Sequence, residues 1–281
     1  MSQDAAPVAQ ALYFRDRDEL RFAGKSADFA DGWVEAAESL CRGFGPPLAG
    51  VACPEALIAR PLGPRHVAVV QVADRPGGLG FRVLALPRVF YAGWIGDPFL
   101  VSERFPPDWS AKGELPTLTW PAEAPPRRTV AQLQQVLQTG GSQTLLGAVQ
   151  ALVDGSRVVF ERAAPAPQLV RDLWALLPNS SRAELWPATF AYGTELGFDV
   201  LVVPPAAVAK PDRYLTEEQV VDYPEGRYEF SLQYAIEHDD QRELNQLLRR
   251  PGSRQRVRLL FFLVAGVTIT YIAINAIRQF L

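Results

Sequence analysis

Two spacings of apolar residues, one of two and one of three to four positions, predict where strands and helices lie along this chain. Residues 66–73 (HVAVVQVA) are almost continuously apolar and β-branched, which is typical of a central strand. Residues 81–87 (FRVLALP) predict a second strand, and the intervening DRPGGLG supplies turn residues. We therefore expect an antiparallel hairpin here, and two further short strands around a charged turn at 11–22.

Apolar residues three and four positions apart predict helices in several other segments. These are 29–42, 130–138, 143–153, 167–177 and, as two helices joined by a brief turn, 228–250. Thr129 and Ser142 precede two of them and have side chains that can cap a helix N-terminus. Asp240 and Glu243 have the spacing of a capping box, which predicts the start of the last helix.

The second half of the chain combines these helices with strands expected at 156–162, 184–192 and 198–204. The helix over 167–177 lies between the first two, and strand–helix–strand at this spacing permits a parallel βαβ unit. Residues 89–120 are irregular and aromatic. The expected fold class is an α+β soluble domain, with an α/β arrangement left open for its second half, followed by one C-terminal transmembrane helix.

The proline-rich stretch PAEAPP at 121–126 is the best internal boundary. With it, the pattern divides the chain into four segments. These are an N-terminal α+β subdomain (1–125), an α/β subdomain (126–205), a loop and helical juxtamembrane stalk (206–256) and a transmembrane helix (257–278). Whether the first two segments form one domain or two stays open.

The expected membrane span is the uncharged stretch LLFFLVAGVTITYIAINAI, from Leu259 to Ile277. As a helix it would extend about 28 Å, which matches a bilayer core about 30 Å thick. The alternative, a buried core helix, would show a polar stripe, which Thr268, Thr270 and Asn275 do not form. The residues expected in the span include Leu259, Phe261, Phe262, Leu263, Val264, Gly266, Ile269, Ile272, Ile274 and Ile277.

Arginines flank this stretch unequally, with five before it and one after it. They are Arg249, Arg250, Arg254, Arg256, Arg258 and, on the far side, Arg278. The positive-inside rule places the preceding residues in the cytoplasm, and the N-terminus lacks the basic and apolar regions of a signal peptide. The expectation is a single-pass, tail-anchored membrane protein with its N-terminal bulk in the cytoplasm and its arginines against the lipid bilayer.

Composition and charge narrow the classes of function. Hydrophobic residues make up 48% of the chain and charged residues 21%, which excludes a disordered protein. Residues 1–248 hold 22 basic and 31 acidic residues, a net charge of −9, whereas the remaining residues hold six arginines and no acid. An acidic folded region argues against nucleic acid as a partner.

Short motifs for catalysis or cofactor binding do not occur in the sequence. His66 and His238 are the two histidines, and neither has further ligands at metal spacing. There is no P-loop and no G-x-S-x-G turn. Cys41 and Cys53 are expected to be reduced thiols of a cytosolic domain, with a single bridge between them as the alternative. A cysteine nucleophile is not expected either, because nothing local would orient a histidine partner for it.

Acidic residues at turns are the other candidates for chemistry. Asp97 stands between Gly96 and Pro98, and Asp108 follows two prolines. Both are positions at which aspartate accepts hydrogen bonds from nearby backbone amides, so a structural role is favoured over that of a general acid. We predict no catalytic residue, no metal ligand and no cofactor from these patterns.

Aromatic residues in the loop-rich region 89–120 are candidates for an exposed interaction surface. Core packing is the alternative role, because large aromatic side chains are usually buried. The candidates are Tyr91, Trp94, Phe99, Phe105 and Trp109.

Three stretches carry a resemblance to a known family: HVAVVQVAD (66–74), LLGAVQALVDGSRVVF (145–160) and LLPNSSRAELWPATFAYG (176–193). With Pro178, Arg182 and Thr189 at fixed positions, residues 11–204 resemble the N-terminal domain of bacterial GTPase-associated proteins and uncharacterised planctomycete proteins of related layout. The resemblance implies a place in GTPase-centred assemblies, such as conflict systems, and no established enzymatic activity. This chain contains no GTPase domain of its own, and the family does not account for a C-terminal membrane helix.

Two hypotheses for function follow. The first is a membrane-tethered cytoplasmic interaction or scaffold module without catalytic activity, whose protein partner is unknown and is a GTPase-containing assembly if the resemblance holds. The alternative is an enzyme of unrecognised class, with a site assembled from dispersed aspartate, glutamate and arginine residues. A deep pocket lined by at least two polar groups with shifted pKa values would favour the enzyme.

Overall fold

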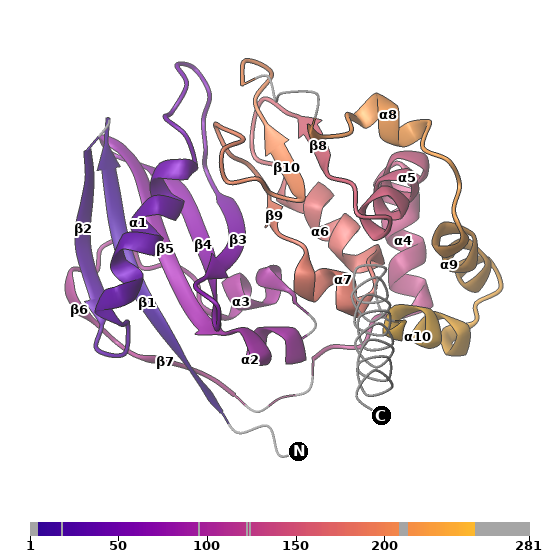
Figure 1. Cartoon of the computed structure of the whole chain (residues 1–281), viewed down its shortest axis with the longest axis horizontal. Helices are drawn as coiled ribbons and strands as arrows, with labels where there is room; N and C mark the ends of the chain where they lie inside the picture. The colour runs from indigo at the N-terminus through magenta and orange to yellow at the C-terminus, as the bar shows by residue number, and fades with distance from the viewer. Residues whose placement is uncertain are drawn as a thin grey trace, which may run out of the picture.

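The described residues form one mixed sheet of ten strands (Figure 1). They belong to a computed structural model and comprise residues 5–17, 19–94, 96–121, 123, 125–207 and 213–250. Across the sheet the strand order is β6–β2–β1–β5–β4–β3–β9–β10–β8, and β7 pairs with β1 off this path.

Long antiparallel strands build the N-terminal part of the sheet. They are β1 (Ala6–Asp16), β2 (Glu19–Ser26), β3 (Ala56–Leu62), β4 (His66–Arg75) and β5 (Gly78–Pro87). β4 and β5 form the predicted hairpin, in register from His66 opposite Pro87 to Arg75 opposite Gly78. Gly77 in its turn has φ +92°, a conformation that glycine adopts without steric cost.

Shorter strands extend the sheet. They are β6 (Gly113–Leu115), β7 (Leu118–Trp120), β8 (Val158–Glu161), β9 (Pro187–Ala188) and β10 (Val200–Val203). β10 runs parallel to both β8 and β9, an arrangement that the sequence permitted and left open. β9 pairs with β3, where Ile58 lies opposite Ala188, and the Thr189 hydroxyl accepts a 2.8 Å hydrogen bond from the Leu57 amide. Strands from both sides of residue 125 thus join one sheet.

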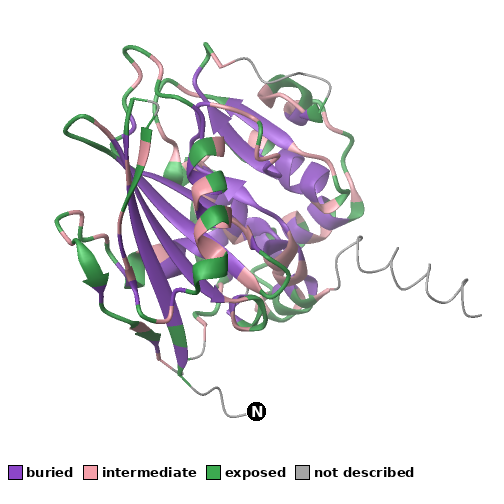
Figure 2. Cartoon of the chain, turned by 60° about the vertical axis from the view of Figure 1, so that its left-hand side comes forward, coloured by how far each residue is buried: buried purple, intermediate pink, exposed green. Residues whose placement is uncertain are grey.

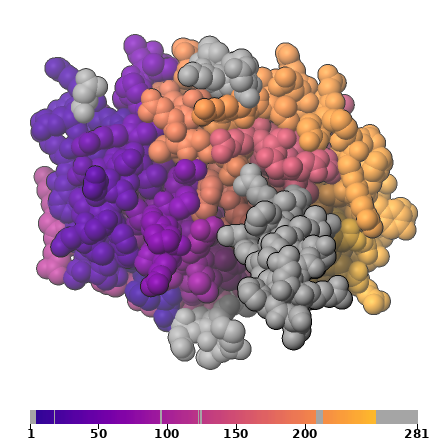
Figure 3. All heavy atoms as spheres, in the orientation of Figure 1, coloured from indigo at the N-terminus to yellow at the C-terminus, as the bar shows by residue number. Residues whose placement is uncertain are grey.

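Helices pack on both faces of this sheet and beyond its β8 end. They are α1 (Val34–Gly43), α2 (Arg88–Gly93), α3 (Pro98–Arg104), α4 (Val130–Thr139), α5 (Ser142–Val153), α6 (Pro167–Leu176), α7 (Asn179–Glu184), α8 (Glu217–Val221), α9 (Arg227–Glu237) and α10 (Gln241–Arg249). α4, α5, α9 and α10 gather at the end opposite β1 and β2 (Figure 1). The N-terminal and C-terminal parts of the described chain therefore lie at opposite ends of the molecular surface shown in Figure 3.

Side chains that alternate along the strands reach different helices on the two faces. On one face Arg15 of β1 donates hydrogen bonds to the carbonyls of Cys41 and Gly45, at the end of α1. On the other face Arg82 of β5 donates to the Phe105 and Pro106 carbonyls, which follow α3, at 2.7 and 2.8 Å. Figure 2 shows the buried strands behind α1, whose outer side is exposed.

The predicted helix starts are confirmed for two helices and corrected for a third. Thr129 and Gln132 form a capping box before α4, and the Asp240 side chain accepts a 2.9 Å hydrogen bond from the Glu243 amide before α10. The expected cap at Ser142 is wrong, because α5 begins after Gly141, whose φ of +76° turns the chain directly from α4.

Several elements were not predicted. Residues 89–120, expected to be irregular, contain α2 and α3. α7 follows the helix expected over 167–177 and was not predicted either. The strand expected over 184–192 contains only the two residues of β9, although the Thr189 and Ala191 amides still donate to Leu57 of β3 and Val202 of β10. The polar segment after residue 206 contains α8, which Thr216 and Gln219 cap.

The expected membrane protein is corrected by this structure. None of the helices formed by the described residues is long and apolar enough to cross a membrane. The part that the structure describes is an α+β domain with one mixed sheet, so the predicted fold class with its added membrane helix, and the single-pass, tail-anchored location, are wrong for it. The segment 257–278 that carried this prediction lies outside the described residues.

Candidate functional site

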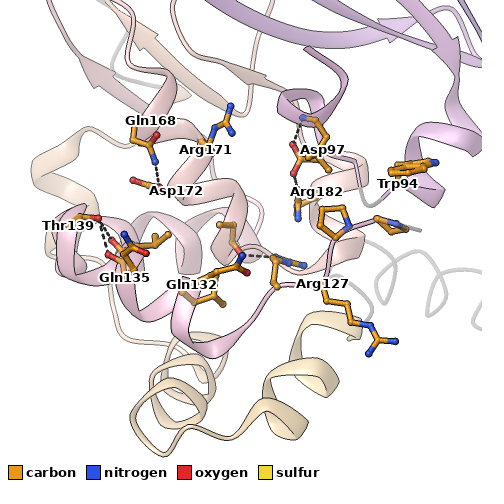
Figure 4. A pocket seen from close by; sticks show the side chains of 17 residues that line it. Trp94, Asp97, Arg127, Gln132, Gln135, Thr139, Gln168, Arg171, Asp172 and Arg182 are labelled. Carbon is orange, nitrogen blue, oxygen red and sulfur yellow. Dashed lines mark hydrogen bonds and ion pairs between the residues drawn. The ribbon is translucent and has the colours of Figure 1, made fainter. Parts of the chain in front are cut away.

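A groove of about 400 Å³ lies where α4, α6, the α2–α3 turn and residues 125–128 meet (Figure 4). We call it the α4–α6 groove. Its size falls within the range of about 300–1,000 Å³ that is usual for ligand sites in proteins. Its apolar lining comes from Trp94, Leu100, Leu133, Val136 and Ala175, together with Pro125 and Pro126.

Helical periodicity explains why a groove forms at this place. Apart from Leu133, the lining residues of α4 are Gln132, Gln135, Val136 and Thr139, and those of α6 are Gln168, Arg171, Asp172 and Ala175. Each set has the spacing i, i+3, i+4 and i+7, so each forms one stripe along its helix. The opposite side of α6 is apolar and packs into the core through Val170, Leu173 and Trp174. Two largely polar stripes that face each other do not close into a core, and a solvent-accessible groove remains.

A buried ion pair lies at the Trp94 side of the groove. Arg182 of α7 donates from Nη2 to Asp97 Oδ2, and the side chains are 4% and 17% exposed. The other Asp97 oxygen, Oδ1, accepts hydrogen bonds from the Phe99 and Leu100 amides and so caps α3, as the turn position of Asp97 predicts. Asp97 thereby joins the start of α3 to α7, two segments far apart in the sequence.

Two buried hydrogen-bond donors lie beside this ion pair. The buried nitrogens Arg182 Nε and Trp94 Nε1 have no hydrogen-bond partner in the part of the chain that the structure describes. Both are donors, and neither residue offers an acceptor. This side of the groove therefore contains more hydrogen-bond donors than acceptors.

Arg128 is a half-buried cation at the edge of the groove. Its Nη1 donates to the carbonyls of Ala175 and Leu177, at 2.7 and 2.5 Å, and its Nη2 donates to Asn179 Oδ1. These carbonyls lie at the C-terminal end of α6, where the helix dipole favours a positive charge. Burial, followed by repulsion from Arg182, lowers the pKa of Arg128 to about 9, so the guanidinium remains charged at neutral pH.

Asp172 is a buried carboxylate on the α6 stripe. Its Oδ1 accepts a 2.7 Å hydrogen bond from Gln168 Nε2, four residues earlier on the same helix (Figure 4). Burial raises the pKa of Asp172, and neither this hydrogen bond nor the nearby charge of Arg171 fully offsets it. Ionisation of Asp172 therefore costs more free energy in the folded protein than in water.

We expect Asp172→Asn to raise the free energy of unfolding at pH 7. A carboxyl whose folded pKa is raised binds more protons when folded, so stability falls as pH rises through the window above the unfolded value, about 3.9. Asparagine removes this loss and retains the acceptor for Gln168. Urea unfolding should show the variant more stable by about 1 kcal/mol at pH 7 and equal to the wild type near pH 3. A wild type that is as stable as the variant at pH 7 would contradict this.

The aromatic residues expected at an interaction surface do not share one exposed face. Tyr91, Trp94, Phe99 and Phe105 are buried in the core, and Trp109 is half-buried. Trp94 and Phe105 each pack against Trp120, with ring centroids 4.7 and 5.7 Å apart. Only Trp94 of these five lines the α4–α6 groove.

The basic residues expected beside a membrane fall partly within the described chain. Arg249 and Arg250 lie at the end of α10, and Arg250 donates a 3.4 Å hydrogen bond to Glu243. The other flanking arginines, and every residue of the expected span, lie outside the described residues.

The three residues at fixed positions of the resemblance have defined structural places. Pro178 precedes α7, Arg182 pairs with Asp97, and Thr189 bonds β3. Arg182 and Thr189 thus connect the second half of the chain to its first half. Sequence reasoning named Arg182 for its position and did not foresee its partner.

The other sequence candidates for chemistry have structural surroundings. The Asp108 carboxylate accepts hydrogen bonds from the amide and hydroxyl of Ser110, at 2.9 and 2.7 Å, as its turn position predicts. Cys41 and Cys53 are free, buried thiols, and burial raises the pKa of both, to about 12 in the case of Cys53. Among the residues that the structure describes, no group of three or more metal-ligating side chains occurs.

No protein-family model, curated protein or solved structure matches this chain. The residues that sequence reasoning did not select in the α4–α6 groove are Arg128, Gln168 and Asp172. The spacing of Gln168, Arg171, Asp172 and Ala175 on the predicted helix 167–177 is the one signal that could have marked a polar stripe.

Proposed function

We propose that this protein is an interaction module without catalytic activity, and that its α4–α6 groove binds an acidic segment of a partner protein. The observation that carries the proposal is Arg128. It is a half-buried cation beside the groove, and its hydrogen bonds go to carbonyl and amide oxygens and to none of the described carboxylates. A cation held in this way attracts a carboxylate more strongly than a cation in open water does.

The balance of charge around the groove supports an acidic occupant. Four arginines line it, Arg127, Arg128, Arg171 and Arg182, against the two carboxylates of Asp97 and Asp172. Burial opposes the ionised form of Asp172. The groove is thus locally basic on a region whose net charge is −9, and it repels cations and favours anions.

The shape of the groove supports a chain segment as the occupant. It is open, it follows two neighbouring helices, and apolar side chains alternate there with neutral amides. Such a surface suits a segment that combines apolar and acidic side chains, because the apolar groups bury while the acids meet the arginines. The chain's own residues 251–281 contain no aspartate or glutamate, so they do not provide this segment.

An enzyme is the second candidate, and a specific observation favours it. The groove contains two polar groups with shifted pKa values, Asp172 and Arg128, and a carboxyl with a raised pKa can act as a general acid. The described lining residues include no serine, cysteine, histidine or lysine that could serve as a nucleophile or partner base. The Thr139 hydroxyl donates to the Gln135 carbonyl of its own helix at 2.9 Å. We therefore prefer the binding role.

The resemblance to GTPase-associated proteins adds a partner class to this proposal. An assembly that contains a GTPase would offer the acidic segment, and this chain would supply the receptor groove. Purified candidate assemblies should then compete with an acidic probe for the α4–α6 groove. If an assembly binds the protein without displacing the probe, its binding site lies elsewhere on the molecule.

The test is a titration with a short fluorescent peptide in which leucine alternates with glutamate, followed by fluorescence anisotropy. The wild-type chain should bind it, and a peptide with lysine in place of glutamate should not bind. Arg127 is exposed and has no ion-pair partner among the described residues, so Arg127→Glu should leave the fold intact. It should weaken binding about tenfold, or about 1.4 kcal/mol.

Matched controls separate the groove from general charge effects. Arg17→Glu makes the same charge change at the exposed β1–β2 turn and should leave the affinity unchanged. Asp172→Asn removes a negative charge from the groove and should tighten binding, whereas it would abolish a reaction that used Asp172 as its acid. Equal binding of the glutamate and lysine peptides would overturn the proposed function.

A further inference from the structure

A second cavity, of about 330 Å³, lies between α7 and α10 on the other side of residues 125–128. We call it the α7–α10 cleft. Its polar lining consists of three arginines and two asparagines, and none of its described lining residues is acidic. These residues are Arg127, Arg128, Asn179, Asn245 and Arg249.

Hydrogen bonds fix the orientation of the first asparagine amide. Arg128 Nη2 donates to Asn179, and a guanidinium can only donate, so the Asn179 atom that meets it is Oδ1. The Asn179 Nδ2 group, a donor, then has no hydrogen-bond partner among the described residues. It is available to a ligand in the cleft.

A chain of three contacts fixes the second amide in the same way. The Val130 amide donates to Gln241 Oε1 at 3.0 Å, and Gln241 Nε2 donates to the Arg128 carbonyl at 3.1 Å. The Val130 N–H can only donate and the Arg128 carbonyl can only accept, so the oxygen and nitrogen of the Gln241 amide cannot exchange places. Gln241 Nε2 also donates to Asn245, at 3.1 Å, which makes the contacting atom Oδ1 and leaves Asn245 Nδ2 without a partner in the part of the chain that the structure describes.

The walls of the cleft are held together independently of any ligand. The Ser180 hydroxyl of α7 donates a 2.9 Å hydrogen bond to the Arg250 carbonyl at the end of α10. Arg128 is held by the end of α6, and Gln241 of α10 holds the Arg128 backbone. Arg128, Asn179 and Asn245 are thus oriented before binding, so that ordering these three donors costs little free energy.

We propose that the α7–α10 cleft binds a phosphate-type oxyanion. Two amide donors and the guanidinium groups of Arg127, Arg128 and Arg249 border one cavity, and none of the described lining groups is a competing carboxylate. A tetrahedral oxyanion offers several acceptor oxygens and a negative charge, which matches a set made only of donors and cations. The cleft shares Pro125, Pro126, Arg127 and Arg128 with the α4–α6 groove, whereas Asn179, Asn245 and Arg249 line the cleft and not the groove.

The experiment is isothermal titration calorimetry of the full chain with inorganic phosphate, adenosine diphosphate and adenosine. Phosphate and the diphosphate should bind, and adenosine should not. Arg249→Glu should weaken phosphate binding about tenfold or more. Asn245→Asp keeps the oxygen that accepts from Gln241 and replaces only the free donor, so it should weaken binding similarly without affecting folding.

Controls and competing outcomes complete the test. Arg242→Glu makes the same charge change at an exposed position of α10 that lines neither cavity, and it should alter the phosphate affinity less than about twofold. Equal affinities for phosphate and the diphosphate would identify a free anion as the ligand, and a much higher affinity for the diphosphate would identify a nucleotide. Absence of phosphate binding, or unchanged binding in both Arg249→Glu and Asn245→Asp, would overturn the proposal. These outcomes test the cleft alone. Peptide binding in the α4–α6 groove is tested by Asp172→Asn, because Asp172 lines the groove and not the cleft.

Discussion

Arg182→Ala should lower the free energy of unfolding by about 3–5 kcal/mol, the usual cost of removing one partner from a buried ion pair. Arg182 is 4% exposed, and its partner Asp97 is 17% exposed. The substitution leaves the Asp97 carboxylate largely removed from water without its cation, although Asp97 still caps α3. Since about 1 kcal/mol shifts the Tm of a domain of this size by about 2–4 °C, the Tm should fall by roughly 10 °C.

A second arginine pair in the same region serves as the control. Arg171 and Glu103 form an ion pair whose side chains are 42% and 52% exposed. Exposed pairs of this kind contribute about 0.2–1 kcal/mol, so Arg171→Ala should have a much smaller effect. The double variant Asp97→Asn/Arg182→Met should recover part of the stability lost in Arg182→Ala, because no charge is then left unpaired. Equal effects of Arg182→Ala and Arg171→Ala would contradict the assignment of a buried pair.

Trp174→Ala should also lower the free energy of unfolding by about 3–5 kcal/mol, because it leaves a large cavity in the core. Trp174 is 1% exposed, and its Nε1 donates a 2.8 Å hydrogen bond to the Gly96 carbonyl. Gly96 has φ +59°, and a side chain there would approach the Arg182 carbonyl to 2.3 Å. Trp174 thus holds the α2–α3 turn close to α7, as the Asp97–Arg182 ion pair requires.

A conservative variant separates the two contributions of Trp174. Trp174→Phe keeps most of the buried ring but leaves the Gly96 carbonyl without its donor, at a cost of about 1 kcal/mol. Urea unfolding of both variants should therefore give a small effect for phenylalanine and a large effect for alanine. If phenylalanine destabilises as much as alanine, the hydrogen bond rather than the packing would be the main contribution, contrary to this account.

Local signals in the sequence predicted the elements that they control. The apolar run 66–73 and the turn after it gave β4 and β5, and Thr129 with Gln132 marks the start of α4. Similar signals for unpredicted helices are present too. Thr216 and Gln219 form a capping box before α8, and Asp97 followed by Pro98 is a helix start that opens α3. With α2 and α3 unrecognised, their aromatic residues were expected in exposed loops.

The groove itself depends on contacts that no local pattern encodes. Asp97 and Arg182 are 85 positions apart, and Arg128 lies 49 positions from the Leu177 carbonyl that it reaches. The polar stripe of α6 is visible in the sequence, but its position opposite the α4 stripe follows from the packing of both helices on α5. Residue types alone also give no information on burial, which determines the raised pKa of Asp172.

The most direct test of the proposed binding role is amide hydrogen exchange of the full chain with and without the alternating leucine–glutamate peptide. Binding in the α4–α6 groove should slow exchange in α4, in α6 and in residues 125–128, and should leave α1 and the β4–β5 hairpin unchanged. Arg127→Glu should reduce this protection at the same peptide concentration, while Arg17→Glu should not. Protection confined to other elements, or equal protection in both variants, would contradict the assignment of the groove as the interaction site.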